Sequence, residues 1–132
     1  MFVRILLGLL GLFHLANGLY MLAAPDSWYA AIPGVAMTGP INHHFIADVG
    51  LAFVASGVGL TLGLRAGKMA ATFALAGATW PALHAFLHLW GWVEHSIPTN
   101  TNVLISEAIG VIALSALGAV LAWINARKEG II

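Results

Sequence analysis

The sequence contains no cysteine and very little charge. The absence of cysteine excludes thiol-disulfide exchange and metal ligation by thiolate. Only 8% of the 132 residues are charged, and the five cations are scattered, so no basic patch indicates a nucleic-acid partner. Apolar residues make up 61% of the chain, and the mean hydropathy of +0.94 lies outside the range of ordinary soluble domains. The composition therefore indicates an integral membrane protein whose immediate partner is the lipid bilayer.

Four apolar stretches are each long enough to cross a bilayer, since a helical crossing needs about 20 such residues. The connections between them leave no room for a separate soluble domain, so we expect a single all-α domain, an integral membrane four-helix bundle over residues 1–132. The first stretch is expected to be a mature crossing and not a signal peptide, because His14 and Asn17 interrupt its apolar run. The predicted helices cover about 2–23, 41–64, 69–92 and 103–125.

The positions of the basic residues predict the orientation of the bundle. All five fall at the N-terminus, in the second connection or at the C-terminus, which share one side of a four-crossing protein. Lys and Arg are enriched on the cytoplasmic side of membrane proteins. Both termini should therefore be cytoplasmic. The residues are Arg4, Arg65, Lys68, Arg127 and Lys128.

Two pairs of ionisable residues lie inside the predicted crossings. His84 and His88 are spaced by four residues, as are His44 and Asp48, and residues at this spacing share one face of a helix. Ionisable side chains in lipid are costly to bury and are usually functional. Each pair is therefore a candidate half of a functional site.

The candidate residues fall at similar depths along their helices. At a rise of 1.5 Å per residue, His44, His88 and Glu107 each lie roughly 30 Å from the nearest cation on their own helix. Asp48 and His84 lie roughly 25 Å from it, and the first helix adds a histidine about one turn lower. The predicted metal ligands are His14, His44, Asp48, His84, His88 and Glu107.

Imidazole and carboxylate groups on facing helices are how helical bundles build mono- and dinuclear metal sites. We therefore predict one or two transition-metal ions, Fe, Zn or Cu, in the half of the bundle that is farther from the cations. An open coordination position would allow a metal-dependent oxidoreductase or hydrolase. The same ligands would serve a protein that stores or transfers metal, so the sequence leaves open whether the chain is an enzyme.

Two alternatives to a non-haem metal site remain open. Haem b needs two axial ligands at one depth, which His44 and His88 could supply. A proton relay or quinone site would use the carboxylates as acid and base and three tryptophans as its walls. These tryptophans are Trp80, Trp90 and Trp92.

The stretches Asn42-His-His-Phe-Ile-Ala-Asp-Val-Gly50 and Leu83-His-Ala-Phe-Leu-His-Leu89 resemble the small bacterial four-helix inner-membrane proteins described as DoxX-like. The likeness covers most of the chain in hydropathy and these two stretches in specific residues. It implies a multi-pass protein of the bacterial inner membrane. Because that family includes accessory partners of oxidoreductase systems, it also implies a membrane oxidoreductase as partner. Small residues along the second and fourth helices allow either tight packing within a monomer or a homo-oligomer.

Overall fold

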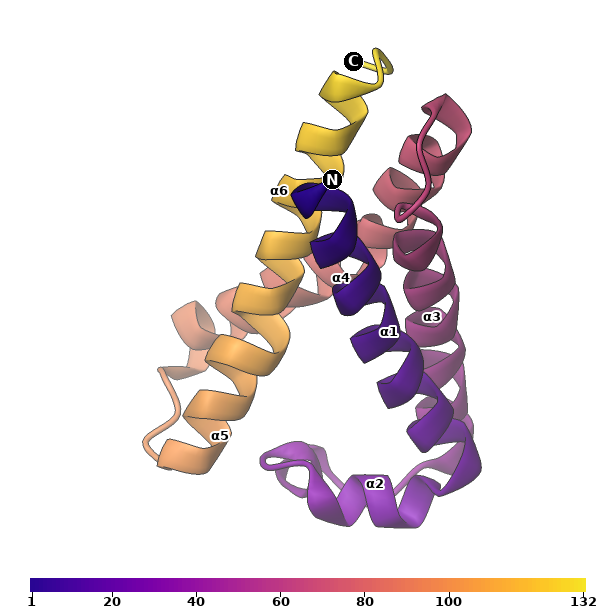
Figure 1. Cartoon of the computed structure of the whole chain (residues 1–132). Coiled ribbons are helices and arrows are strands. Elements are labelled where there is room, and N and C mark those ends of the chain that lie inside the picture. Colours follow the sequence, from indigo (N-terminus) through magenta and orange to yellow (C-terminus); the bar gives the residue numbers. More distant parts are fainter.

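The computed structural model describes residues 1–132 and contains helices and connections but no strand, so the all-α prediction is confirmed (Figure 1). The α5, η2 and α6 segments form one continuous helix, of which η2 is a π-helical stretch. The elements in chain order are α1 (Phe2–Ala23), α2 (Pro25–Ala31), η1 (Val35–Thr38), α3 (His43–Leu62), α4 (Lys68–His95), α5 (Thr101–Ile105), η2 (Ser106–Ala113) and α6 (Leu114–Lys128).

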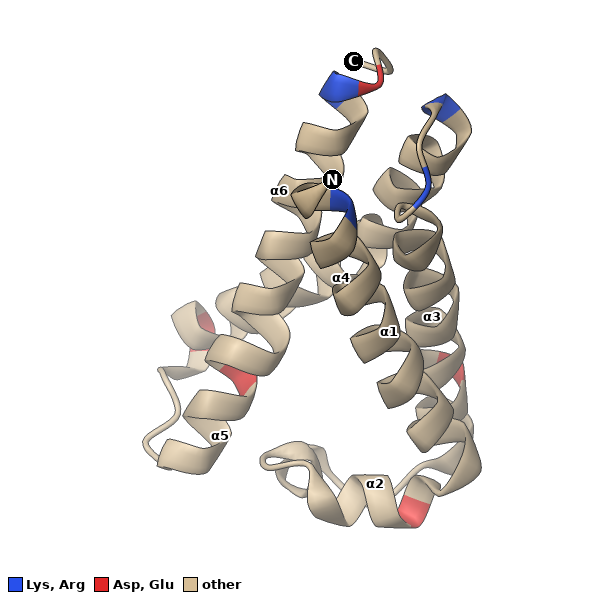
Figure 2. Ribbon diagram, viewed as in Figure 1, with Lys and Arg blue, Asp and Glu red and all other residues tan.

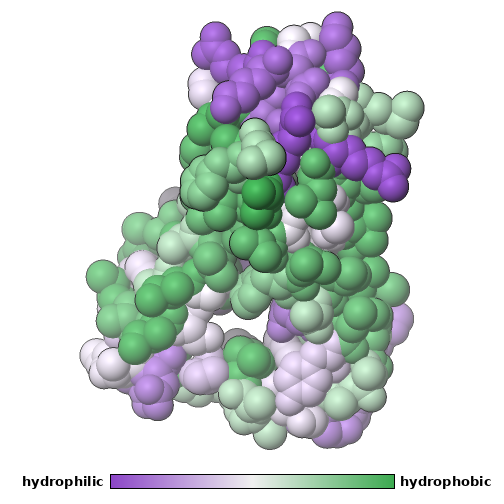
Figure 3. Space-filling view, viewed as in Figure 1, coloured by the Kyte–Doolittle hydropathy of each residue, from purple (hydrophilic) through white to green (hydrophobic).

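Four helices are long and apolar enough to cross a membrane, as the sequence predicts. They are α1, α3, α4 and the continuous helix Thr101–Lys128. The observed ends differ from the predicted ones by at most three residues. Apolar residues cover the middle of the molecule in Figure 3, and polar residues gather at its ends. This distribution is the one expected of a bundle that is surrounded by hydrocarbon.

Glycine lets α3 approach both of its neighbours closely. A Cβ atom on Gly57 would come within 2.5 Å of the backbone nitrogen of Leu15 in α1, so no larger residue fits there. On another side of α3, a Cβ atom on Gly59 would lie 2.8 Å from the Cα atom of Gly77 in α4. Close backbone contact of this kind is how helices associate in lipid, where no hydrophobic force drives them together.

The remaining helix completes the bundle by packing on α4 and, less extensively, on α1. A buried apolar cluster joins all four crossings, and it consists of Leu7, Leu10, Leu60, Ala74, Ala78, Leu121 and Ala122. Away from this cluster, α1 and α3 diverge from α5 and the first part of α6, and α2 lies across the open end (Figure 1).

All five Lys and Arg residues lie at one end of the bundle, which we call the basic end (Figure 2). Both chain termini lie there too. Glu129 joins three segments at this end, because its carboxylate pairs with the Arg4 guanidinium and also accepts a hydrogen bond of 3.0 Å from the backbone N–H of Gly67. The shared position of the termini follows from an even number of crossings.

The opposite end, which we call the distal end, is covered by the connection between α1 and α3. Trp28 of α2 is buried, and its indole N–H donates to the Asn17 side chain of α1 at 3.0 Å. An ion pair of 3.1 Å joins Asp26 to His43 at the start of α3. Farther along the connection, Gly34 lies directly against the side chain of Val103 in α5. The connection therefore reaches from one side of the distal end to the other.

We expect Gly57→Ala to destabilise the protein by about 1–3 kcal/mol, because the added methyl group forces α1 away from α3. Equilibrium unfolding of the purified protein in detergent measures this change. Gly91→Ala is the matched control, since a Cβ atom there meets nothing within 4 Å. Equal stability of the two variants would contradict the close packing of α1 on α3.

Candidate functional site

Four side chains spaced by four residues line one face of α4. Trp80, His84, His88 and Trp92 follow one another at this spacing, which stacks successive side chains along a helix. The His84 ring lies parallel to the Trp80 ring at 4.9 Å between centroids. It meets the His88 ring edge to face at 4.8 Å. An unbroken row of aromatic and imidazole rings therefore runs along α4 toward the distal end.

The row ends on a carboxylate from the neighbouring helix. Nδ1 of His88 lies 3.6 Å from Oε2 of Glu107, and the Trp92 indole N–H donates to the same oxygen at 2.6 Å. The His88 and Glu107 side chains are only 28% and 21% exposed. Glu107 therefore has two partners on α4. We refer to His84, His88, Trp92 and Glu107 as the α4–η2 cluster.

Glu107 lies in the π-helical stretch η2. A π-helix replaces the i→i+4 hydrogen bond with an i→i+5 bond, which is rare and is frequently found at functional sites. No feature of the sequence predicts this stretch. Its position beside the two histidines of α4 is an independent indication that this part of the bundle is specialised.

His14 of α1 lies deeper in the bundle and makes no hydrogen bond. It is 1% exposed, and neither of its ring nitrogens has a partner. Its ring stacks on Phe53 of α3 at 5.6 Å, and Phe53 in turn meets the rings of Trp80 and His84. Phe53 therefore contacts both His14 and His84 of the α4–η2 cluster.

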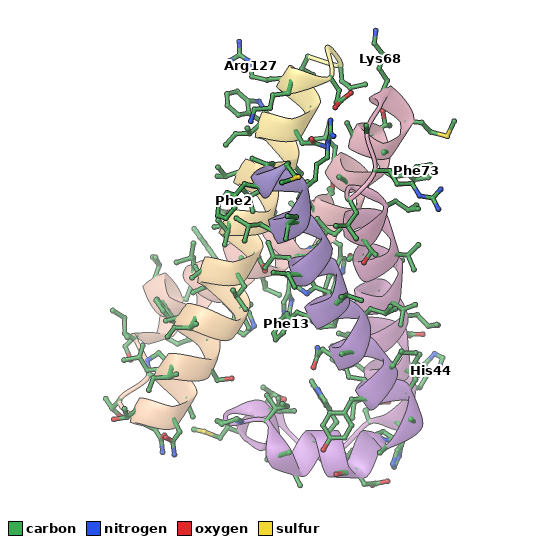
Figure 4. All side chains as sticks on the ribbon, viewed as in Figure 1. Phe2, Phe13, His44, Lys68, Phe73 and Arg127 are labelled. Atoms are coloured by element: carbon green, nitrogen blue, oxygen red, sulfur yellow. The ribbon has the colours of Figure 1, made fainter.

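His44 and Asp48 do not join the other predicted ligands. They lie 3.5 Å apart, but their side chains are 90% and 61% exposed. Figure 4 shows His44 pointing away from the bundle. The buried residues of α3, among them Ile46, Gly50 and Gly57, lie on its opposite face and pack toward α1 and α4. The predicted depths give height along a helix but not direction around it, which is why these two residues were grouped with the others.

The structure thus divides the six predicted ligands into three sets. His84, His88 and Glu107 adjoin one another, His14 lies apart behind Phe53, and the pair on α3 faces outward. No group of three His, Asp or Glu side chains is arranged to hold a metal ion. The metal and haem hypotheses therefore stay predictions.

Sequence reasoning missed the partner of Glu107. Trp92 was predicted only as a wall of a pocket, yet its indole N–H makes the shortest contact to the carboxylate. Its spacing of four residues from His88 was a signal that could have placed it on the same face.

Comparisons of the chain with protein-family models, with curated proteins and with solved structures found no match. The resemblance to DoxX-like proteins therefore stays a prediction as well.

We expect Trp92→Phe to lower the free energy of unfolding in detergent by about 1.5–3 kcal/mol, because the Glu107 carboxylate loses a charge-assisted hydrogen bond. Trp90→Phe is the matched control: Trp90 is 49% exposed and makes no side-chain hydrogen bond, so it should cost less than about 0.5 kcal/mol.

A double-mutant cycle that combines Trp92→Phe with Glu107→Gln isolates the contribution of the pair. The two changes should be non-additive, since each removes the same charge-assisted contact. Strict additivity would show that the contact is absent in solution.

Proposed function

We propose that the chain is a membrane-embedded binding protein that takes up an apolar, hydrogen-bonding ring ligand of the quinone class from the lipid and exchanges a proton with it. One observation carries this proposal. His84 lines an open groove on the outer side of α4, and its ring also touches His88, which pairs with Glu107. A single imidazole thus connects a ligand-sized apolar surface to a partly buried acid-base pair.

The groove suits a flat, apolar ligand. It has a volume of about 650 Å³, and His84 is the one polar residue among the six that line it. Such sites bind ligands mainly by apolar and aromatic contact, with few polar groups to fix orientation. A ring with a carbonyl or hydroxyl group would stack on the indoles and hydrogen-bond to the imidazole. The lining residues are Trp80, Leu83, His84, Phe86, Leu87 and Trp90.

The His88–Glu107 pair, which adjoins the groove residue His84, can accept the proton. Imidazole gains or loses a proton near neutral pH more readily than any other side chain. A proton that reaches His84 can pass to His88, whose charge the adjacent Glu107 carboxylate would balance. Glu107 is 21% exposed and belongs to the helix that begins at the distal end, so in this proposal the proton passes from His88 to its carboxylate and leaves toward that end.

A transition-metal ion is the second candidate. His84, His88 and Glu107 are of the residue types that bind Fe, Zn and Cu, but their side chains would have to rearrange to surround one ion. Elemental analysis of the protein purified in detergent separates the two candidates. A stoichiometric metal that is lost in His88→Ala would replace the proton-exchange proposal, and a Soret band would favour haem b instead.

The proposed setting is the bacterial inner membrane, with the basic end and both termini in the cytoplasm. The clustering of all five cations at one end supports this orientation. The proton would then be exchanged with the compartment outside the cytoplasm. A membrane oxidoreductase that uses quinones would be a suitable partner.

The proposed function predicts that the reconstituted protein binds a 2-hydroxy-3-alkyl-1,4-naphthoquinone saturably, which quenching of tryptophan fluorescence detects. His84→Ala should raise the dissociation constant about tenfold, since it removes one hydrogen bond worth roughly 1.4 kcal/mol. His95→Ala is the control, because His95 is 82% exposed and lies at the end of α4 away from the groove.

Titration calorimetry in two buffers of different ionisation enthalpy counts the protons exchanged with the buffer when the same ligand binds. Because the acidic hydroxyl group of this ligand is ionised in neutral solution, wild type should take up a proton from the buffer as the anion binds, and Glu107→Gln should bind the ligand without this uptake. Quenching that never saturates, or a proton count that is unchanged in Glu107→Gln, would contradict the proposal.

The orientation predicts the activity of reporter fusions in a bacterial host. Green fluorescent protein fused after Ile132 should fluoresce, and alkaline phosphatase fused after Ile97, in the connection between α4 and α5, should be active. The opposite pattern would place the basic end outside the cytoplasm.

A further inference from the structure

The outward face of α3 carries an imidazole and a carboxylate, His44 and Asp48, that the proposed function does not use. His44 Nε2 and Asp48 Oδ2 lie 3.5 Å apart, on side chains that are 90% and 61% exposed. Neither side chain makes a hydrogen bond or an ion pair with any other residue of the chain. The two side chains therefore contact only each other, and both are accessible to a group from outside the chain.

The position of Asp48 makes this exposure unusual. The 20 residues of α3 span about 30 Å, which is the thickness of the hydrocarbon layer. Asp48 is five residues from the start of α3, so it lies roughly 7.5 Å inside that end of the helix. Farther along the same face, Leu51 is 56% and Val58 47% exposed, as expected of a surface that meets lipid. Ionisable residues at such depth almost always face the interior of a bundle or pair with another group.

An imidazole and a carboxylate supply half of a four-coordinate zinc sphere. No third His, Asp or Glu of this chain is placed to extend the pair into a metal site. A second copy related by a two-fold axis brings the same two side chains to the same point, because such an interface is self-complementary. An axis along the membrane normal keeps both copies in one orientation.

Charge also favours this arrangement. Two carboxylates that approach each other in lipid would repel, whereas one divalent cation between them balances both. A second copy can approach this face closely, because the residue between Leu51 and Val58 is the small Ala55. We propose that the outward face of α3 binds a second copy of the chain through one Zn²⁺ ion, held by His44 and Asp48 of both copies.

This inference does not depend on the proposed function, because the α4–η2 cluster lies on other helices and none of its residues takes part. The experiment uses the full chain in detergent. Its molar mass is measured by light scattering after size exclusion, with ZnCl₂ and then with EDTA, and bound zinc is measured by elemental analysis.

The expected result is a dimer with one zinc ion per two chains, which EDTA returns to monomer. His44→Ala and Asp48→Asn should remain monomeric in zinc, and both should fold because the side chains that they change are exposed. Helical circular dichroism verifies the folding of each variant.

Two controls locate the site. His43→Ala removes the neighbouring histidine, which pairs with Asp26, and should leave the zinc-dependent dimer intact. His88→Ala should do the same, whatever it does to ligand binding. Wild type that stays monomeric in zinc, a dimer that persists in EDTA, or a dimer that forms equally well in His44→Ala and Asp48→Asn would each overturn the proposal.

Discussion

Hydrocarbon does not solvate charge, so a side chain that is charged within it needs a partner from the protein. Glu107 shows the consequence most directly. Its carboxylate has an indole N–H at 2.6 Å and an imidazole at 3.6 Å, both from α4. These contacts join α4 to η2 in the part of the bundle where α1 and α3 diverge from α5. The row of rings that ends on Glu107 therefore links α4 to η2 and also provides the groups for the proposed proton exchange.

The glycine contacts between α1, α3 and α4 determine which faces remain for function. Because Gly57 and Gly59 bring their neighbours into backbone contact, two sides of α3 are occupied by packing. The third side is left to His44 and Asp48, which face away from the bundle. On α4, exposed residues such as Leu83 and Leu87 line the groove, and His84 lies at its inner border, where its ring also contacts Phe53 of α3. Packing by small residues thus leaves the α4–η2 cluster between helices and the His44–Asp48 pair on the outer surface.

The sequence predicted the fold well because hydropathy and length determine where a chain can cross a bilayer. The four long apolar helices and the gathering of all basic residues at one end follow from such features. The sequence predicted the candidate site only in part. Spacing by four placed His84 and His88 together, but the depth of His44 could not show that its side chain points outward. The direction in which a side chain points depends on which helix face packs. For α3 this is decided by Gly57 and Gly59, whose neighbouring helices could not be identified from the sequence alone.

The central claim is that His88 and Glu107 form a pair that responds to a ligand at His84. Solid-state NMR of the protein in lipid bilayers, with ¹⁵N-labelled histidine and ¹³C-labelled glutamate, tests it most directly. The account predicts magnetisation transfer between the His88 ring nitrogen and the Glu107 carboxyl carbon, together with a shift of the His84 ring nitrogens when the naphthoquinone is added. Absence of that transfer, or His84 signals that do not change at saturating ligand, would contradict it.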